Sequence, residues 1–184
     1  MLLDVAIGII GALLAWPGVV LPPASFLALG MIFAVAPDID VILSARRLRG
    51  RGRYAHRHRD VLHSPLLYLP IGFLLLAPVS ERVAVLFVAL SLFHFLHDSV
   101  GIGWGVRWLY PFSPDAFKFF ADAQNHFSWH MCTRWTPDEL SSAVERYGHD
   151  DWFARYYLHP HPIGIIENSI FVIVVLCVAL LYLR

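Results

Sequence analysis

The stretch VAVLFVALSLFHFLHDSV, residues 83–100, combines a long apolar run with ionisable side chains at its end. Its length is close to the roughly 20 residues that a helix needs to cross the hydrocarbon core of a bilayer. His94 and Asp98 stand four residues apart, so on a helix both side chains project from the same face. The stretch therefore predicts a membrane-spanning helix with a pair of candidate metal ligands at one end.

The composition of the whole chain agrees with this interpretation. Of the 184 residues, 58% are hydrophobic and 15% are charged, whereas soluble domains carry about 25% charged residues. The formal net charge is zero, which gives no reason to expect nucleic acid as a partner. Cys132 and Cys177 are isolated, which excludes a disulfide framework and a zinc-finger pattern.

Apolar segments suggest a polytopic, all-α membrane protein with about four to five transmembrane helices. Five segments are candidates, at residues 3–20, 24–43, 65–79, 83–100 and 163–183. Pro70 and Pro78 interrupt the short third segment, which could be bent or partly inserted. An alternative is that the first or the third segment is re-entrant.

Residues 114–162 differ in character from these segments, and we expect them to form an interfacial or cytoplasmic helical insertion. They separate a membrane domain, residues 1–113, from a C-terminal transmembrane helix, residues 163–184. The abundance of Phe, Trp and His in residues 115–131 suggests a helix at the membrane interface. Downstream, the sequence TPDE at 136–139 predicts a capping box that starts a second helix, ending at Gly148.

The positions of the arginines predict the orientation of the protein in the membrane. Seven of the thirteen lie between Arg46 and Arg59, and cytoplasmic loops retain positive residues. The N-terminus and residues 101–162 would then also be cytoplasmic. For most of these arginines, a topology signal or a contact with anionic lipid is a better explanation than catalysis.

On that topology, separate apolar segments deliver carboxylates and imidazoles to the same face of the membrane. The candidates are Asp38, Asp40, His58, His63, His94, His97, Asp98 and Glu167. An ionisable group at membrane depth costs about 2.5–3.5 kcal/mol and usually marks pairing or function. A divalent metal would offset this cost for several groups at once, and mixed Asp/His ligation favours zinc or manganese, as one or two ions.

Each feature taken alone has a structural explanation. Asp38 and Asp40 could cap a helix end, and His94 with Asp98 could be a buried structural pair. His126 and His130 are also four residues apart, but they lie among aromatic residues, where interfacial packing is the better explanation. The convergence of four segments at one face argues against the structural explanation for the whole set.

The motifs PDID, HRDVLHS and HFLHDSVGIGWGVRWLYPFS, in this order over residues 30–113, resemble the YdjM-like family of bacterial inner-membrane proteins, described as metal-dependent hydrolases. The resemblance implies a metal site formed by Asp38, Asp40, His58, His63, His94 and Asp98. Arg59 and Ser64 accompany these motifs. The chain departs from the family pattern at Asp60 and Leu62, and it has Asp4 where the family has an early Thr-His.

These observations lead to the hypothesis of a multi-pass inner-membrane hydrolase whose metal-activated water attacks an ester or phosphoester at the cytoplasmic interface. The candidates for catalytic roles are His58, Arg59 and Glu167, with Arg59 pairing with an anionic substrate oxygen. The expected partners are membrane lipids and a small or lipid-like substrate. The alternative is a non-catalytic, metal-stabilised protein that binds a lipid or protein through its basic loop. A transporter is disfavoured because the outer halves of the segments are almost devoid of polar groups.

Overall fold

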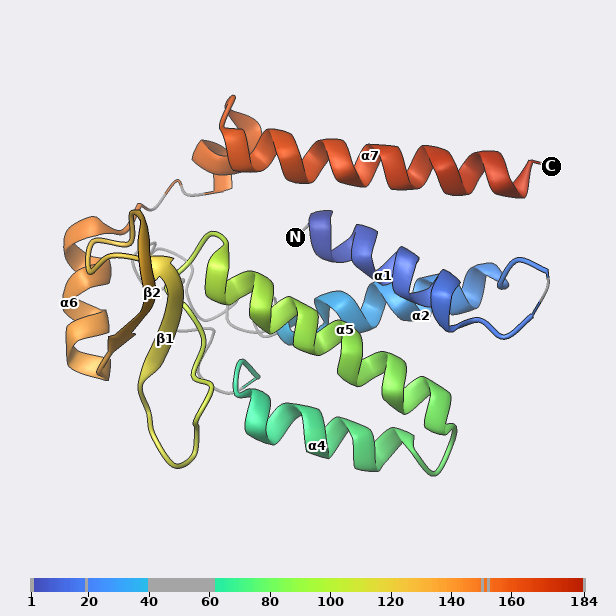
Figure 1. Ribbon diagram of the computed structural model, residues 1–184, viewed down its shortest axis with the longest axis horizontal. Coiled ribbons are helices and arrows are strands. Elements are labelled where there is room, and N and C mark those ends of the chain that lie inside the picture. The colour runs from blue at the N-terminus through green and yellow to red at the C-terminus, as the bar shows by residue number, and fades with distance from the viewer. Residues whose placement is uncertain (1, 19, 40–61, 150, 152, 184) are drawn as a thin grey trace.

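The computed structural model describes the chain except for residues 1, 19, 40–61, 150, 152 and 184. Apolar helices lie roughly along the long axis, and a two-stranded sheet crosses one end of them (Figure 1). The long-axis helices are α1 (Leu2–Ala15), α2 (Ala24–Val35), α4 (Pro65–Leu76), α5 (Glu81–Val100) and α7 (Pro162–Tyr182). The protein is therefore mostly helical, as expected, although it is not all-α.

Helix α5 is the central element of this arrangement. It contacts α1, α2 and α4 along its length, and strand β1 near its C-terminal end. Its buried apolar side chains Leu86, Phe87 and Leu90 form the core with Phe33 of α2, and the rings of Phe33 and Phe87 meet edge to face with centroids 5.3 Å apart. Because this core fixes α5, it also fixes the position of the ionisable residues at its end.

Two helices, α5 and α7, are long and apolar enough to cross a membrane by length and composition. Helix α1 has 14 residues, or about 21 Å at 1.5 Å per residue, and α2 and α4 have 12 residues each. All three are shorter than the hydrocarbon core, which is about 30 Å thick. Helix length among the described residues therefore supports two spans, fewer than the four or five expected.

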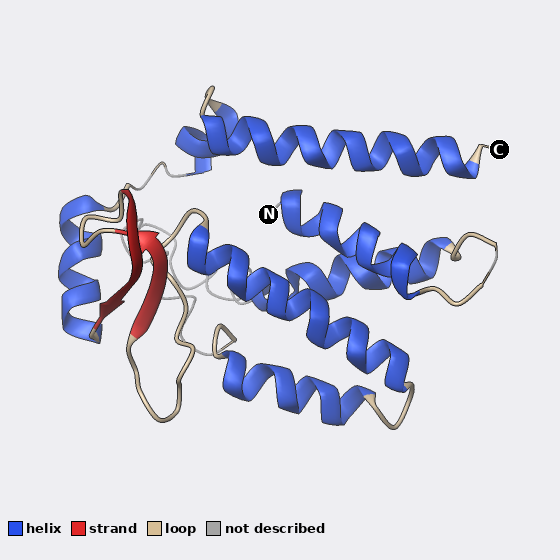
Figure 2. Ribbon diagram, viewed as in Figure 1, coloured by secondary structure: helices blue, strands red, loops and turns tan. Residues whose placement is uncertain are grey.

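The prediction of an interfacial helix over residues 115–131 is wrong. Strand β1 (Ala116–Ala121) pairs antiparallel with β2 (Phe127–Trp135) in a hairpin (Figure 2). Aromatic side chains and threonine suit a pleated surface, and apolar side chains alternate with polar ones along β2, which is the period of a strand. The abundance of aromatic residues fits an interfacial helix and a strand equally, and the period of two from Phe127 to Met131 favours the strand.

The turn of the hairpin is fixed by Asp122. Its Oδ1 accepts hydrogen bonds from the backbone N–H groups of His126 at 2.8 Å and Gln124 at 2.9 Å. The hydrogen bond from His126, followed by the bond from Gln124, holds the pKa of the Asp122 carboxyl below its ordinary value. Asn125 adopts φ 64° in this turn, a left-handed conformation that Asn tolerates better than most residues.

The capping box predicted for the next helix is confirmed. In α6 (Pro137–Tyr147), the Thr136 hydroxyl accepts a bond from the Glu139 N–H, and the Glu139 carboxylate accepts one from the Thr136 N–H at 2.9 Å. Gly148 follows the last residue of α6, as expected. A single π-helical turn, η3 (Ala154–Leu158), then leads to α7.

Helices α1 and α2 pack backbone against backbone at a pair of glycines. A Cβ atom on Gly8 would lie 2.6 Å from the carbonyl oxygen of Gly30, which is too close for any side chain. Gly8 lies one helical turn from Asp4, so this close packing also sets the distance of Asp4 from its neighbours. Neither backbone can move without displacing its whole helix.

We expect Gly8→Ala to destabilise the protein by about 1–3 kcal/mol, the usual cost of overpacking, measured as a lower thermal midpoint in detergent. The matched control is Gly11→Ala in the same helix, where the new methyl group would meet side chains rather than backbone, the closest being the tip of Leu90 at 2.7 Å. The control gains helix propensity and needs only a side-chain shift. Equal destabilisation by both substitutions would contradict the prediction.

Candidate metal centre

Four ionisable side chains from separate parts of the chain meet at one end of the helices. They are Asp38, His63, His94 and Asp98, which we call the four-residue cluster. Each offers one ligand atom, and these atoms all lie within 4.8 Å of one another. Of the predicted metal-site residues that the structure describes, all four are brought together here, and their role as ligands stays a prediction.

Local structure explains why these side chains converge. His94 and Asp98 are one turn apart in α5 and therefore project from the same face. Helix α2 tightens after Val35 into a 3-10 turn, η1 (Ala36–Asp38), and this tighter winding changes the direction in which Asp38 points. His63 lies just before α4, and its ring packs against Phe95 with centroids 6.0 Å apart.

The distances within the cluster suit ligands that share an ion. His63 Nε2 lies 3.4 Å from Asp38 Oδ1 and 3.3 Å from Asp98 Oδ2. His94 Nε2 lies 3.6 Å and 3.8 Å from the same two oxygens. Bonds of 2.0–2.2 Å in a tetrahedral arrangement would place neighbouring ligand atoms about 3.4 Å apart. The same four atoms could therefore surround a single ion.

Burial makes a compensating charge necessary. His63 and His94 are 0% and 1% exposed, and Asp98 is 8% exposed. Within the described part of the chain, neither ring nitrogen of His94 makes a hydrogen bond, because the nearest carboxylate oxygens are too distant. Asp98 is a buried carboxylate, which is costly without a counter-charge, and the Asp38 carboxylate beside it is only 26% exposed. A divalent cation would supply it, so both the donor chemistry and the spacing fit a metal ion.

A second group of buried ionisable residues adjoins the cluster. His97 Nδ1 lies 2.9 Å from Asp4 Oδ1, and His97 Nε2 lies 3.2 Å from Glu167 Oε1. Asp4 and Glu167 are 1% and 3% exposed. One imidazole of α5 thus joins a carboxylate of α1 to a carboxylate of α7, and we call these three residues the carboxylate–histidine network.

Asp4 connects the two groups. The oxygen that contacts His97 also lies 3.6 Å from His94 Nδ1, on the side of the ring opposite the cluster. Metal-bound histidines usually direct their second ring nitrogen at a carboxylate, which fixes the orientation of the ring. Asp4 was not predicted as a site residue, although it is the only charged residue before Asp38, and a lone acid in an apolar helix needs a partner.

Glu167, predicted to be catalytic, lies against His97 rather than within the cluster. Tyr157 of η3 is hydrogen-bonded to it, and burial together with the Glu167 charge raises the pKa of this tyrosine above its ordinary value. The tyrosine stays protonated and can donate a hydrogen bond to the carboxylate. The network therefore extends from the helices to the segment that precedes α7.

The remaining predicted residues lie elsewhere or outside the described part of the chain. Asp40, His58 and Arg59 fall within residues 40–61, which the structure does not describe. His126 and His130 lie on the hairpin; the His126 side chain is 76% exposed and its ring lies 3.5 Å from Asp122. The interpretation of both histidines as residues of interfacial packing rather than metal ligands stays a prediction.

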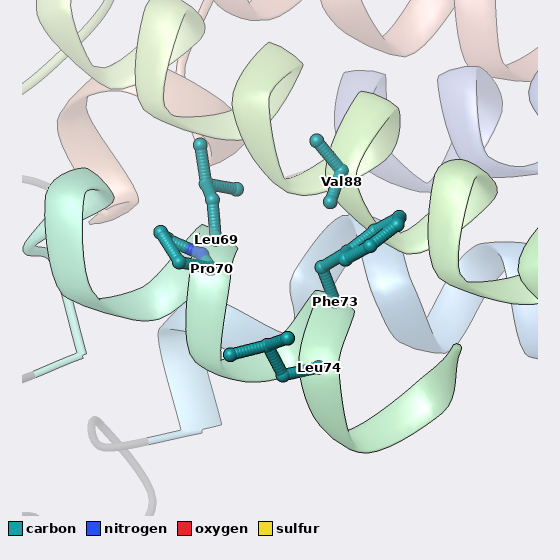
Figure 3. A pocket seen from close by; sticks show the side chains of 5 residues that line it. All are labelled: Leu69, Pro70, Phe73, Leu74 and Val88. Atoms are coloured by element: carbon teal, nitrogen blue, oxygen red, sulfur yellow. The ribbon is translucent and has the colours of Figure 1, made fainter. Parts of the chain in front are cut away.

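A shallow apolar groove lies on the outer side of α4 and α5, away from these ionisable residues. It is lined by Leu69, Pro70, Phe73, Leu74 and Val88 (Figure 3). None of its lining residues can ligate a metal or transfer a proton. The groove therefore does not contribute to the candidate metal centre.

Comparison with known proteins gives one finding. Residues 4–184 match the family model described as YdjM inner membrane protein. Neither the curated proteins nor the solved structures contain a match. The match extends far beyond the motifs at residues 30–113 and includes the hairpin and α7.

We expect the protein purified in detergent to contain a stoichiometric divalent ion by elemental analysis. His94→Ala and Asp98→Ala each remove a ligand atom of the cluster and should bring the metal content well below one ion per chain. His130→Ala alters an exposed hairpin histidine and should leave it unchanged. Asp4→Asn should retain the site but weaken its affinity about 10–100-fold, the usual effect of losing a carboxylate behind a ligating histidine.

A native protein without bound metal, after purification with zinc or manganese present, would contradict this prediction. An equal loss of metal in His130→Ala would show that the substitutions act through general unfolding.

Proposed function

The chain belongs to the YdjM inner membrane protein family, and on this basis we propose that it is a membrane-embedded, metal-dependent hydrolase. Its substrate would be an ester or phosphoester, lipid-like in character, reached at the cytoplasmic surface of the membrane. The observation that carries the proposal is the buried Asp38–His63–His94–Asp98 cluster, whose ligand atoms lie within 4.8 Å of one another.

The placement of the cluster supports a site at a membrane surface. It lies at the C-terminal end of the candidate span α5, and Glu167 lies near the start of the second candidate span, α7, at the same end of the molecule (Figure 1). The basic loop containing Arg46–Arg59 connects η1 to the residues before α4. Asp38 and His63, on either side of this basic segment in the sequence, belong to the cluster, so the positive-inside rule favours a cytoplasmic location for that end.

We propose that the three shorter apolar helices are also inserted, giving four or five membrane segments. They pack against α5 and one another, as α1 does with α2 and α4 does with α5. Helices that are partly covered by protein do not each need the full bilayer thickness, because neighbouring helices and local thinning accommodate the difference.

The chain's own residues would divide the work of hydrolysis. The four-residue cluster holds the ion, zinc or manganese by its mixed donors, with Asp40 and His58 as further candidate ligands. When bound, a divalent ion supplies Lewis acidity and lowers the pKa of water towards neutrality. Arg59 pairs with an anionic substrate oxygen through its planar guanidinium, and His58, if it is not a ligand, transfers a proton.

The geometry suggests a different role for Glu167. It contacts His97, which contacts Asp4, and Asp4 faces His94. Glu167 thus acts through other residues and is a positioning residue rather than a catalytic one. Its function is to hold His97 and Asp4 so that His94 presents Nε2 to the ion.

Metal-loaded protein should hydrolyse bis-p-nitrophenyl phosphate or p-nitrophenyl butyrate, and a chelator should abolish the activity until the ion is restored. Asp98→Asn should lower turnover at least about 100-fold because it weakens both metal binding and water activation. Arg59→Lys should raise KM for the phosphoester more than for the neutral ester, since lysine lacks the bidentate guanidinium.

The proposal would be contradicted if the protein, fully loaded with metal, hydrolysed neither of the two probes nor a phospholipid. That result would favour the non-catalytic alternative, in which the metal stabilises the fold and the basic loop binds a partner.

The topology is testable by cysteine labelling after Cys132 and Cys177 are replaced by serine. In spheroplasts, a membrane-impermeant maleimide should label Ser80→Cys, in the turn between α4 and α5, and leave Ser44→Cys in the basic loop unlabelled. Both should react after lysis. Labelling of Ser44→Cys before lysis would contradict a cytoplasmic site.

A further inference from the structure

The only lysine of the chain is buried. Lys118 of β1 is 2% exposed, and a lysine is rarely buried to this extent unless its ammonium is paired. Its Nζ donates hydrogen bonds to the carbonyl oxygens of Gly101 and Gly103, the second at 3.0 Å. Both glycines belong to the turn at residues 101–105, which directly follows α5. A buried cation of the hairpin therefore holds the backbone of this turn.

The backbone of the hairpin brings Lys118 to this position. Lys118 pairs with Thr133 of β2 in the regular part of the strand pairing. Its neighbour Phe117 forms an isolated bridge with Val106, and the two residues exchange backbone hydrogen bonds of 2.9 Å and 3.0 Å. These backbone bonds do not involve the lysine side chain. The hairpin should therefore keep its place when the ammonium is removed.

Two further side chains bind the same end of α5. Asn125 in the hairpin turn donates from Nδ2 to the carbonyl oxygen of Gly103 at 2.9 Å. The Nε1 of Trp108 donates to the Ser99 hydroxyl at 2.8 Å, and this hydroxyl donates to the carbonyl oxygen of Phe95 at 2.7 Å. The last turn of α5 and the residues that follow it are thus held by several independent hydrogen bonds, of which those of Lys118 carry a full charge.

The held backbone is continuous with a residue of the four-residue cluster. Asp98 lies three residues before Gly101, and the Gly101 N–H donates to the carbonyl oxygen of His97 at 2.6 Å. Carbonyl oxygens at a helix end carry partial negative charge, which a cation stabilises. A shift of Gly101 would move the turn that carries Asp98, and residues of a binding site must be held to within about 0.5 Å.

We propose that Lys118 is a positioning residue for the metal centre. Its ammonium fixes the end of α5, so that the Asp98 carboxylate stays where it can share an ion with His63 and His94. This role rests on the proposed metal centre and makes the hairpin part of the support of the site. A lysine that only stabilised the helix end would affect the free energy of unfolding without affecting how the ion is coordinated.

The test uses the full chain in detergent, loaded with cobalt(II), whose visible absorption reports the geometry of its ligands. Lys118→Met keeps an unbranched side chain and removes the ammonium. We expect it to weaken cobalt affinity about 10–100-fold, as for the loss of other groups that orient metal ligands, and to alter the position and intensity of the visible bands.

A second variant keeps the test decisive if Lys118→Met does not fold. Asn125 has φ 64°, a conformation that glycine adopts freely, so Asn125→Gly removes the amide donor without straining the backbone. It should change the cobalt bands in the same direction and weaken affinity by at most about tenfold, the factor that corresponds to one hydrogen bond.

The matched control removes a different cation from the same hairpin. Arg134 pairs with Asp115, with Nη2 and Oδ2 2.6 Å apart, and does not bind the turn after α5. Arg134→Met should lower the thermal midpoint and leave the cobalt bands and affinity as in the native protein.

Native cobalt bands and affinity in both Lys118→Met and Asn125→Gly would overturn the proposal, whatever their thermal midpoints. An equal change in Arg134→Met would also overturn it, because any loosening of the hairpin would then have the same effect. A native protein that binds neither cobalt nor zinc would instead overturn the metal centre on which the proposal rests.

Discussion

Two carboxylates and two imidazoles share one buried end of an apolar helix bundle, and their need for a counter-charge constrains the rest of the structure. The His63 and His94 nitrogens lie 3.3–3.8 Å from oxygens of Asp38 and Asp98, close enough for all four side chains to share a cation. Without a cation, the two carboxylates would repel each other at a site that is largely buried. The ends of these helices lie close together, where one divalent ion could reach all four side chains. The core around Phe33, Phe87 and Leu90 keeps α2 and α5 in the register that this requires.

The carboxylate–histidine network extends the same constraint to the outer helices. Asp4 and Glu167 are each isolated acids in apolar helices, and each would be costly to bury alone. His97 contacts both, and thereby connects α1 and α7 to α5 beside the cluster. Helix α7 has few other buried residues, so the contact between Glu167 and His97 contributes much to holding α7 in its position against α5. The backbone contact of Gly8 with Gly30 serves the complementary purpose of bringing α1 close enough for Asp4 to reach His94 and His97.

The sequence was most informative where chemistry and helical period coincide. Three features could be predicted from the sequence because each depends on residues that lie close together in the chain. They are the shared face of His94 and Asp98, the capping box at Thr136 and the individual motifs that carry the family resemblance. The family membership anticipated from those motifs is confirmed over residues 4–184. Asp4 was missed because its significance depends on His97, more than ninety residues away. The hairpin was missed because aromatic side chains suit an interfacial helix and a strand equally, and only the alternation along β2 separates them.

The position of Glu167 has a consequence for the order in which the protein is assembled. A ribosome makes α1 before α5 and α7, so Asp4 is synthesised long before the final partner of the network exists. His97 can contact Asp4 as soon as α5 is in place, but its second ring nitrogen has no carboxylate until α7 follows. The network that supports His94 is therefore complete only after α7 has been made. A nascent chain or a truncated product would carry the ligand residues without the support that orients them.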